Sequence, residues 1–381
     1  MRRVLLLGLA GLVACSAAAQ VAQPPPAPKA AASAVTASSA PADAGIDAVE
    51  ATDGASEDGA DGAIPDAATA SADAGAAGPS SCPEGMKLVE GDYCTEVEQK
   101  CLRSWFDKSN RKTVCEEFEP HTTCIGERVK KRFCIDTYSW PNVKGERPEV
   151  MNYFYQAEVK CAAVGKRMCT ESEWTMACEG PEMKPYPYGY ARDPTKCNGD
   201  RPWDGPHMHL VAKRDAHELG RLWQGVRSGS QPDCISDYGV ADLPGNTDEV
   251  VASEHFGSDW KSKYDSVHTG GPWYKGVRNQ CRPKIYTHDE GFYYYFLSFR
   301  CCAEPDSKPT DPRTPKQIKA NWPFSRVEHL ARFSVEQMRE KLELKRQGKC
   351  TCREHDVLCK TMCGTLLGPN AVDADLHAPR P

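Results

Sequence analysis

Hydrophobic and polar residues follow two different patterns along the chain, and each pattern predicts a different kind of element. Apolar residues recur at helical spacing over 151–164, which predicts a helix, and a second short helix is expected over 171–178. Short runs of branched and aromatic residues predict strands at 86–89, 132–135 and 296–299. Because the segments between them are rich in proline and glycine, we expect an irregular α+β domain.

A third helical pattern lies near the C-terminus, after a linker that contains proline and lysine. Over 325–348 the apolar residues form one stripe, which predicts a single amphipathic helix. The members of the stripe are Val327, Leu330, Phe333, Val335, Met338, Leu342 and Leu344. Such a stripe packs either on the main domain or on a separate partner, and we expect it to pack on the main domain.

The first eighty residues have the composition of a targeting segment followed by a tether. Arg2 and Arg3 precede an apolar run that is too short to span a bilayer and that ends in the sequence LVAC, which resembles a bacterial lipobox. We therefore expect residues 1–15 to be a lipoprotein signal peptide and Cys15 to carry the lipid. An ordinary cleaved signal peptide is the alternative. Residues 16–80 contain mostly Ala, Pro, Ser, Gly and Asp and no aromatic residue, so we expect a disordered tether.

Cysteine content indicates the compartment of the protein, and the charge distribution bears on its partner. The chain has 19 cysteines, which indicates an oxidising compartment, and setting Cys15 aside leaves an even number that can all pair. The net charge of −6 is the sum of +2 from Arg2 and Arg3 and −8 from residues 16–80, which hold nine acids against Lys29, whereas residues 81–381 are neutral overall. A neutral globular region argues against nucleic acid as the partner. We expect an exported lipoprotein that is anchored in the membrane of a bacterial cell envelope, with Ser16 favouring the outer membrane.

Four segments, in order along the chain, resemble the formylglycine-generating enzyme family, also called the sulfatase-modifying factors. They read FCIDTYSWPN (133–142), GKRMCTESEWTMACEG (165–180), YGVADLPGNTDEV (238–250), and GGPW (270–273) with SFRC (298–301). The resemblance implies the compact, disulfide-rich fold of that family, which is related to C-type lectins, over residues 81–305. Residues 306–381 would then be a linker, an amphipathic helix and a Cys-rich tail.

The resemblance also implies two structural disulfides. Carried over from the family, these bridges would join Cys161 to Cys301 and Cys178 to Cys281. The six cysteines between 82 and 134 have no counterpart of this kind, and their pairing stays open.

The copper site of the family's oxidases has no counterpart in this sequence. Those enzymes bind Cu(I) through two cysteines that follow a GGS motif, and they convert a cysteine of a target protein to formylglycine. Here Lys275 and Gln280 stand at the two positions, and Pro272 replaces the serine. Since only Cys281 remains and one thiolate does not make a Cu(I) pair, we expect no copper and a non-catalytic binding or scaffold module. The alternative is a formylglycine-generating oxidase that uses Cys281.

Two binding sites follow from the same resemblance. The oxygen ligands of a family calcium site fall on Asp242, Gly245, Thr247 and Glu249, so we expect calcium there. The oxidase groove would remain as a binding groove for an extended peptide, a glycan or an envelope protein. Its expected residues, which mix aromatic and basic groups, are Trp273, Tyr274, Lys275, Arg278 and Arg282.

The last four cysteines form a separate cluster. Cys350, Cys352, Cys359 and Cys363 could hold zinc, but their spacing lacks paired C-x2-C motifs. In an exported protein we expect two disulfides in the tail instead.

Overall fold

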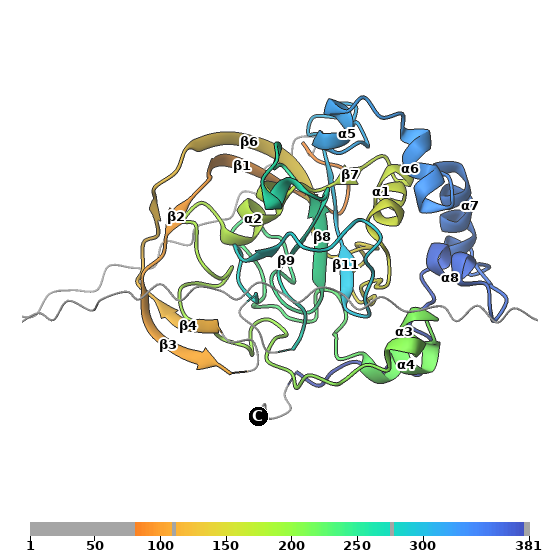
Figure 1. The fold of residues 1–381 in the computed structure, drawn as a ribbon, viewed down its shortest axis with the longest axis horizontal. Helices are drawn as coiled ribbons and strands as arrows, with labels where there is room; N and C mark the ends of the chain where they lie inside the picture. The colour runs from red at the N-terminus through yellow and green to blue at the C-terminus, as the bar shows by residue number, and fades with distance from the viewer. Residues whose placement is uncertain (1–80, 109–111, 275–277, 377–381) are drawn as a thin grey trace, which may run out of the picture. The chain divides into compact units, whose positions relative to one another are not determined.

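Two four-stranded sheets form the framework of the protein, as the computed structural model shows for residues 81–108, 112–274 and 278–376 (Figure 1). The first sheet has the strand order β1-β6-β12-β7, and the second has the order β10-β9-β8-β11. The strands of the first sheet are β1 (Met86–Cys94), β6 (Arg128–Asp136), β7 (Arg167–Met168) and β12 (Cys301–Ala303). Those of the second are β8 (Asp248–Ala252), β9 (Ser266–Thr269), β10 (Lys284–Ile285) and β11 (Leu297–Phe299). Two separate ribbons pair β2 (Val97–Glu98) with β5 (Thr123–Cys124) and β3 (Cys101–Asp107) with β4 (Lys112–Phe118).

The antiparallel pair of β1 and β6 is longer than the sequence pattern predicts. Each strand has nine residues, and they pair from Met86 opposite Asp136 to Cys94 opposite Arg128. Only the half that ends at Asp136 is buried, whereas residues 128–130 are exposed and two of them, Arg128 and Lys130, are charged. The apolar pattern therefore identified the buried half and missed the polar half, which is held by backbone hydrogen bonds.

Both helices that were predicted in the main domain are present. Helix α1 (Phe154–Ala163) begins three residues later than expected, after Met151, whose φ of 70° is not helical. Helix α2 (Glu171–Glu179) begins with a capping box between Thr170 and Glu173, which fixes its first turn. The remaining helices of this region are α3 (Met208–Ala212), α4 (Ala216–Leu222) and the short η1 (Trp260–Ser262).

The prediction of a single helix over 325–348 is wrong, because the segment forms two helices. Helix α6 (Phe324–Ala331) ends where Arg332 takes a left-handed conformation with φ 67°, and α7 (Val335–Arg346) starts from a new capping box between Ser334 and Gln337. Both helices pack on the main domain, because Val327 and Met338 are fully buried in a core that also contains Phe154 of α1. The expected docking on the main domain is therefore correct. None of the described helices is long and apolar enough to cross a membrane.

Strand β12 separates two hydrophobic cores. Its residue Cys301 belongs to the core that contains α1 and the C-terminal helices, whereas the next residue, Cys302, belongs to the core around Trp174 of α2. Successive side chains of a strand point to opposite faces, which places the two sulfurs on opposite sides of the sheet. The C-terminal region adds α5 (Pro315–Lys319) and α8 (Val357–Cys363) to the helical side (Figure 1).

All eighteen cysteines within the described ranges are joined in nine disulfides. They are Cys82–Cys134, Cys94–Cys124, Cys101–Cys115, Cys161–Cys301, Cys169–Cys302, Cys178–Cys281, Cys197–Cys234, Cys350–Cys363 and Cys352–Cys359. The fold is thus mixed α/β and disulfide-rich with C-terminal helices, as expected. The predicted signal peptide, Cys15 and the tether lie outside the described residues.

Candidate ligand-binding site

The cysteine at the expected oxidase site is not a free thiol. Cys281 is fully buried and bonded to Cys178, and Cys161 is bonded to Cys301, which are the two pairs that the family resemblance implies. A Cu(I) site needs thiolates, and a sulfur in a disulfide is not one. Lys275 lies outside the described residues. The donor groups present at Gln280 and Cys281 therefore do not fit copper.

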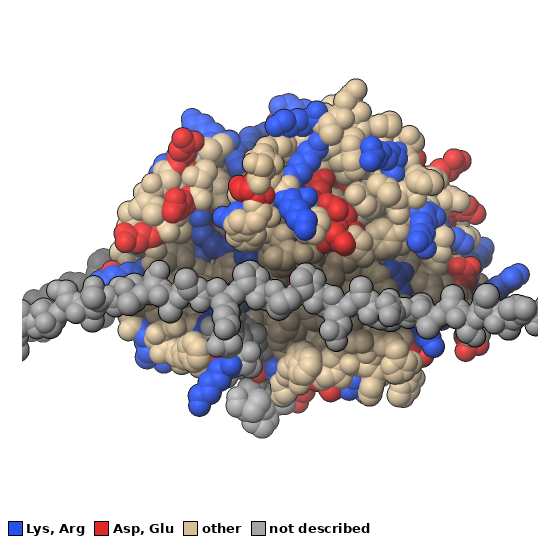
Figure 2. Space-filling model, in the orientation of Figure 1, with Lys and Arg blue, Asp and Glu red and all other residues tan. Residues whose placement is uncertain are grey.

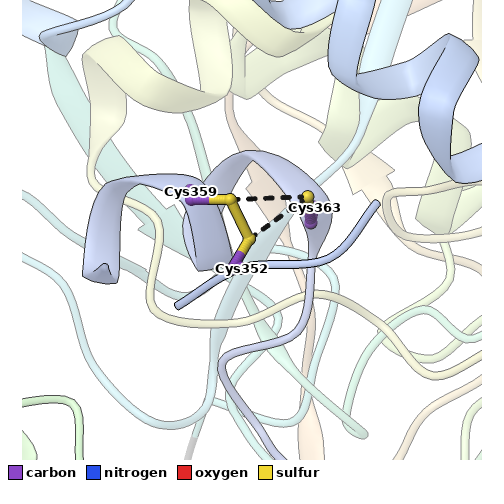
Figure 3. A group of neighbouring side chains, drawn as sticks. All are labelled: Cys352, Cys359 and Cys363. Carbon is purple, nitrogen blue, oxygen red and sulfur yellow. Dashed lines mark hydrogen bonds between the residues drawn. A yellow bond between two sulfur atoms is a disulfide. The ribbon is translucent and has the colours of Figure 1, made fainter. Parts of the chain in front are cut away.

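The tail cysteines are likewise joined to one another. The sulfur atoms of Cys352, Cys359 and Cys363 lie within 4.8 Å of one another, a spacing that thiolates around a metal would also have (Figure 3). However, Cys352 is bonded to Cys359 and Cys363 to Cys350. The structure therefore has the two tail disulfides that the spacing and compartment led us to expect, and these sulfurs do not fit zinc.

Glu249, one of the expected calcium ligands, already has four hydrogen bonds. Its Oε2 accepts from the indole of Trp174 and from Nε of Arg300, both at 2.7 Å, and its Oε1 accepts from Ser139 and from Nη2 of Arg300. Arg300 is itself fully buried, so its guanidinium neutralises the carboxylate inside the core. Because all four lone-pair positions are used, Glu249 does not fit a calcium ion in this arrangement.

The other three expected ligands keep free oxygens. Asp242 is buried, and its Oδ2 accepts from the backbone N–H of Gly229 at 2.8 Å while its Oδ1 has no partner. Burial raises the pKa of this carboxyl to about 6. Among the described residues, the backbone oxygens of Gly245 and Thr247 accept no hydrogen bond. A buried carboxylate oxygen without a partner, near two free carbonyl groups in the chain, fits the oxygen-rich ligand set that Ca²⁺ prefers.

The residues expected to line a groove are placed in different environments. Trp273 is 1% exposed and packs edge-on against Trp223 with ring centres 5.0 Å apart, so it is a core residue. Tyr274 packs against the same core, and Nη1 of Arg278 donates to both oxygens of Asp248. These side chains therefore do not form one groove.

Arg282 does line a cavity, which we call the charged cavity and which has a volume of about 420 Å³. Its lining comes from four parts of the fold: the β1–β6 strand pair, the start of α2, the segment from β8 to η1, and the segment that contains β10. The lining residues are Tyr93, Thr95, Val129, Lys131, Glu171, Ser172, Glu254, His255, Lys261, Arg282, Lys284 and Tyr286. A volume of this size is typical of small-ligand sites.

Two glutamates are held rigidly in the wall of the charged cavity. Glu171 accepts from the backbone N–H of Glu254 at 2.9 Å and from the hydroxyl of Tyr286 at 2.7 Å. Glu254 in turn accepts from the backbone N–H of Ser172 at the start of α2 and from Lys131 at 3.2 Å. This reciprocal arrangement fixes both carboxylates without using all of their lone pairs.

Lys284 is the most perturbed cation of the cavity. Its Nζ donates to Oγ1 of Thr175 at 2.6 Å and to the backbone oxygen of Arg282 at 3.3 Å, and both of these acceptors are neutral. The pKa of the Lys284 ammonium is lowered to about 8, chiefly by burial; the carboxylate of Glu171 opposes this effect, and the neighbouring guanidinium of Arg282 adds to it. Arg282 itself donates to both oxygens of Glu179 at 2.6 and 2.7 Å.

Aromatic rings form the rim of the charged cavity. Trp260, which is 63% exposed, meets Tyr286 edge-on with ring centres 5.6 Å apart, and His255 meets the same tyrosine at 5.2 Å. The ammonium of Lys261 lies over both rings, 5.8 Å from Trp260 and 5.6 Å from Tyr286. On the face drawn in Figure 2, basic and acidic side chains are interspersed.

Sequence reasoning named only Arg282 among the residues of this cavity. Glu171 and Ser172 belong to the TESEW part of a family-like segment, and Lys284 follows Arg282 by two residues, so the local signals were present. The cavity was missed because its wall combines these segments with Tyr93 and Lys131, which are distant in the sequence.

Comparison with known proteins relates the main domain to one family. Residues 95–305 match the family described as the sulfatase-modifying factor enzyme 1-like domain. A curated protein of Bos taurus, named inactive C-alpha-formylglycine-generating enzyme 2, is 34% identical over 117 residues. That match covers 30% of this chain and 36% of the bovine protein, so the chain spans about a third of the relative's length.

Two solved structures are also similar to this chain. CarF aligns with a TM-score of 0.37 and 13% identity over 60% of this chain and 99% of its own. PvdO from Pseudomonas aeruginosa aligns with a TM-score of 0.36 and 15% identity over 57% of this chain and 93% of its own.

Proposed function

We propose, from the premise that this chain belongs to the sulfatase-modifying factor enzyme 1-like domain family, that it is a non-catalytic member which works as a ligand-binding module. The observation that carries the proposal is that the nine disulfides use every cysteine among the described residues, Cys281 included. The similarity to a bovine protein that is named inactive supports it. The charged cavity supplies a site for the ligand.

The alternative function is oxidation of a target cysteine to formylglycine. It requires a free thiol pair for Cu(I), and the oxidised protein offers none among its described residues. The test is to incubate the oxidised full-length protein with Cu(I), oxygen and a peptide that contains Cys-x-Pro-x-Arg, beside an active family oxidase as the positive control. We expect no aldehyde by mass spectrometry. An aldehyde, together with a free Cys281 in a thiol titration, would overturn the proposal.

We further propose that a lipid on Cys15 anchors the module in the bacterial cell envelope, at the outer membrane. The lipobox-like sequence before Cys15 supports this, and so does the pairing of all other cysteines, which leaves Cys15 without a disulfide partner inside the described part of the chain. Metabolic labelling with an alkyne fatty acid is expected to mark the wild type. Labelling of the Cys15→Ser variant to the same level would refute the assignment.

Calcium is proposed as a structural ion held by Asp242 and by the backbone oxygens of Gly245 and Thr247. When bound, it would supply charge compensation to the unpartnered oxygen of Asp242. Calcium is therefore expected to raise Tm relative to EDTA in the wild type and in the exposed control Asp92→Asn, but not in Asp242→Asn. Equal rises in all three proteins would place the ion elsewhere.

A further inference from the structure

We propose that the charged cavity binds an acidic saccharide, held by an oxyanion on Lys284 and Lys261, by hydroxyl groups on Glu171 and Glu254, and by a ring face on Trp260. This inference rests on the proposed function, because it names the ligand class of the same module.

Some positive side chains of the cavity form ion pairs with a carboxylate in the described part of the chain, and others do not. Arg282 is paired with Glu179 and Lys131 with Glu254. In contrast, no carboxylate of the described residues lies within 4.0 Å of Lys284 or Lys261, which contact neutral oxygens and aromatic rings. Two ammonium groups that form no ion pair within 4.0 Å inside the described ranges provide a binding point for a carboxylate or sulfate group.

The glutamates show that the ligand is more than a simple anion. Glu171 and Glu254 also line the cavity and would repel an inorganic anion placed between them. Glu171 accepts from the hydroxyl of Tyr286 and the backbone N–H of Glu254, Glu254 accepts from the backbone N–H of Ser172, and both carboxylates retain lone pairs. Rigid acceptors of this kind bind hydroxyl donors, so the geometry favours a ligand that carries both an oxyanion and several hydroxyl groups.

The rim supplies the third element of saccharide recognition. Trp260 is 63% exposed although it contacts Tyr286, and its ring is fixed from one side by that contact. An exposed tryptophan with a rigid base presents a flat apolar face beside polar groups, which suits the C–H face of a sugar ring. Uronate and sulfated sugars share this chemistry, and the experiment distinguishes them.

The test measures binding of saccharides to the oxidised full-length protein by isothermal titration calorimetry. The probes are an oligogalacturonate, a heparin-derived oligosaccharide, a neutral malto-oligosaccharide and poly-glutamate. We expect one or both of the acidic saccharides to bind, with the stronger one identifying the oxyanion, and the other two to bind at least about tenfold more weakly. Tighter binding of poly-glutamate, equal binding of the neutral oligosaccharide, or no binding of either acidic saccharide would overturn the proposal.

Variants locate the site. Lys284→Met and Trp260→Ala are each expected to weaken binding by about tenfold or more, since each removes a whole contact. Lys130→Gln is the matched control, because Lys130 precedes Lys131 on β6 and is exposed on the other face of the strand. Thermal unfolding of each variant shows whether it is folded. Unchanged affinity in folded Lys284→Met would refute the assignment.

A pH series separates a direct role of the Lys284 ammonium from a structural one. Because the pKa of Lys284 is lowered to about 8, the wild type is expected to lose affinity between pH 7 and pH 9, whereas Lys284→Arg keeps its charge and its affinity over that range. Parallel pH profiles would contradict the direct contact. Failure of these binding tests leaves the non-catalytic function standing, since that is decided separately by the aldehyde assay.

Discussion

Cys301 and Cys302 close almost the same loop, and this makes their two disulfides partly redundant. Cys301 is bonded to Cys161 across 140 residues of sequence and Cys302 to Cys169 across 133. While one of these bridges is intact, its partner residues are already held together. The second bridge then closes only a small ring, which runs through residues 161–169 and 301–302 and contains about nine residues. In the chain-entropy model, closing such a loop stabilises the folded protein by about 2.6 kcal/mol at 25 °C, whereas closing an isolated loop of 140 residues stabilises it by about 5 kcal/mol.

Loss of both bridges is expected to cost more than the two single losses together. The nearest remaining constraint is then Cys178–Cys281, which leaves a loop of about 37 residues that contributes about 3.8 kcal/mol. The double loss therefore destabilises the protein by about 6.4 kcal/mol, against about 5.2 kcal/mol for the two single losses added. Packing losses from the missing sulfur atoms occur in both cases and cancel in this difference.

The assay is urea unfolding of the proteins C161A/C301A, C169A/C302A and the quadruple variant, with all other disulfides intact. The expected coupling is about 1.2 kcal/mol, with the quadruple variant less stable than additivity predicts. Removal of Cys101–Cys115, which shares no loop with these bridges, is the control and should add independently. A single loss of about 5 kcal/mol, or strict additivity of the two bridges, would refute the reasoning.

Three further predictions concern other buried or strained residues. Arg300→Met leaves Glu249 as an uncompensated charge in the core, so we expect a loss of about 3–5 kcal/mol in urea unfolding, partly restored by adding Glu249→Gln; a loss below about 1 kcal/mol would contradict the buried pair. Burial raises the pKa of the Asp265 carboxyl to about 7, whereas its value in the unfolded chain is near 4. The folded protein therefore favours the protonated carboxyl, and the free energy of unfolding is expected to fall as the pH rises from about 4 to about 7. Unfolding measured across that range should show a flatter pH dependence in Asp265→Asn, and an unchanged slope would disprove the shift. Arg332→Gly relieves a left-handed conformation and should stabilise the protein by about 0.5–1 kcal/mol, whereas a continuous helix would be destabilised by a similar amount.

The family and the main elements were predictable because their signals are local. The motifs at 165–180 and 238–250 are contiguous, and the resemblance they carry was confirmed by the family match. The break between α6 and α7 also had a local signal, since Ser334 and Gln337 have the spacing of a capping box. It was missed because the apolar stripe continues across Arg332, and a stripe alone does not show where backbone hydrogen bonds stop.

The parts of the site that could not be predicted depend on contacts between distant segments. Trp273 lies in a glycine-rich segment that looks like a loop, but Trp223 and Phe296 enclose it. Glu249 has the position of a calcium ligand, and only the three-dimensional structure shows that Arg300, 51 residues away, occupies its oxygens. Sequence position identifies a donor group, whereas its remaining lone pairs depend on the fold.

The bridge between Cys82 and Cys134 has a mechanical consequence if the proposed lipid on Cys15 anchors the chain. A pull on the chain before Cys82 would then pass through this bond into β6, an inner strand of the sheet, rather than peel β1 from its free end. Strand β6 is flanked by β12, whose two neighbouring cysteines fasten it to both cores. Tension would therefore be carried by covalent bonds into the centre of the domain, and the sheet should keep its shape under shear that would separate an unbridged pair of strands.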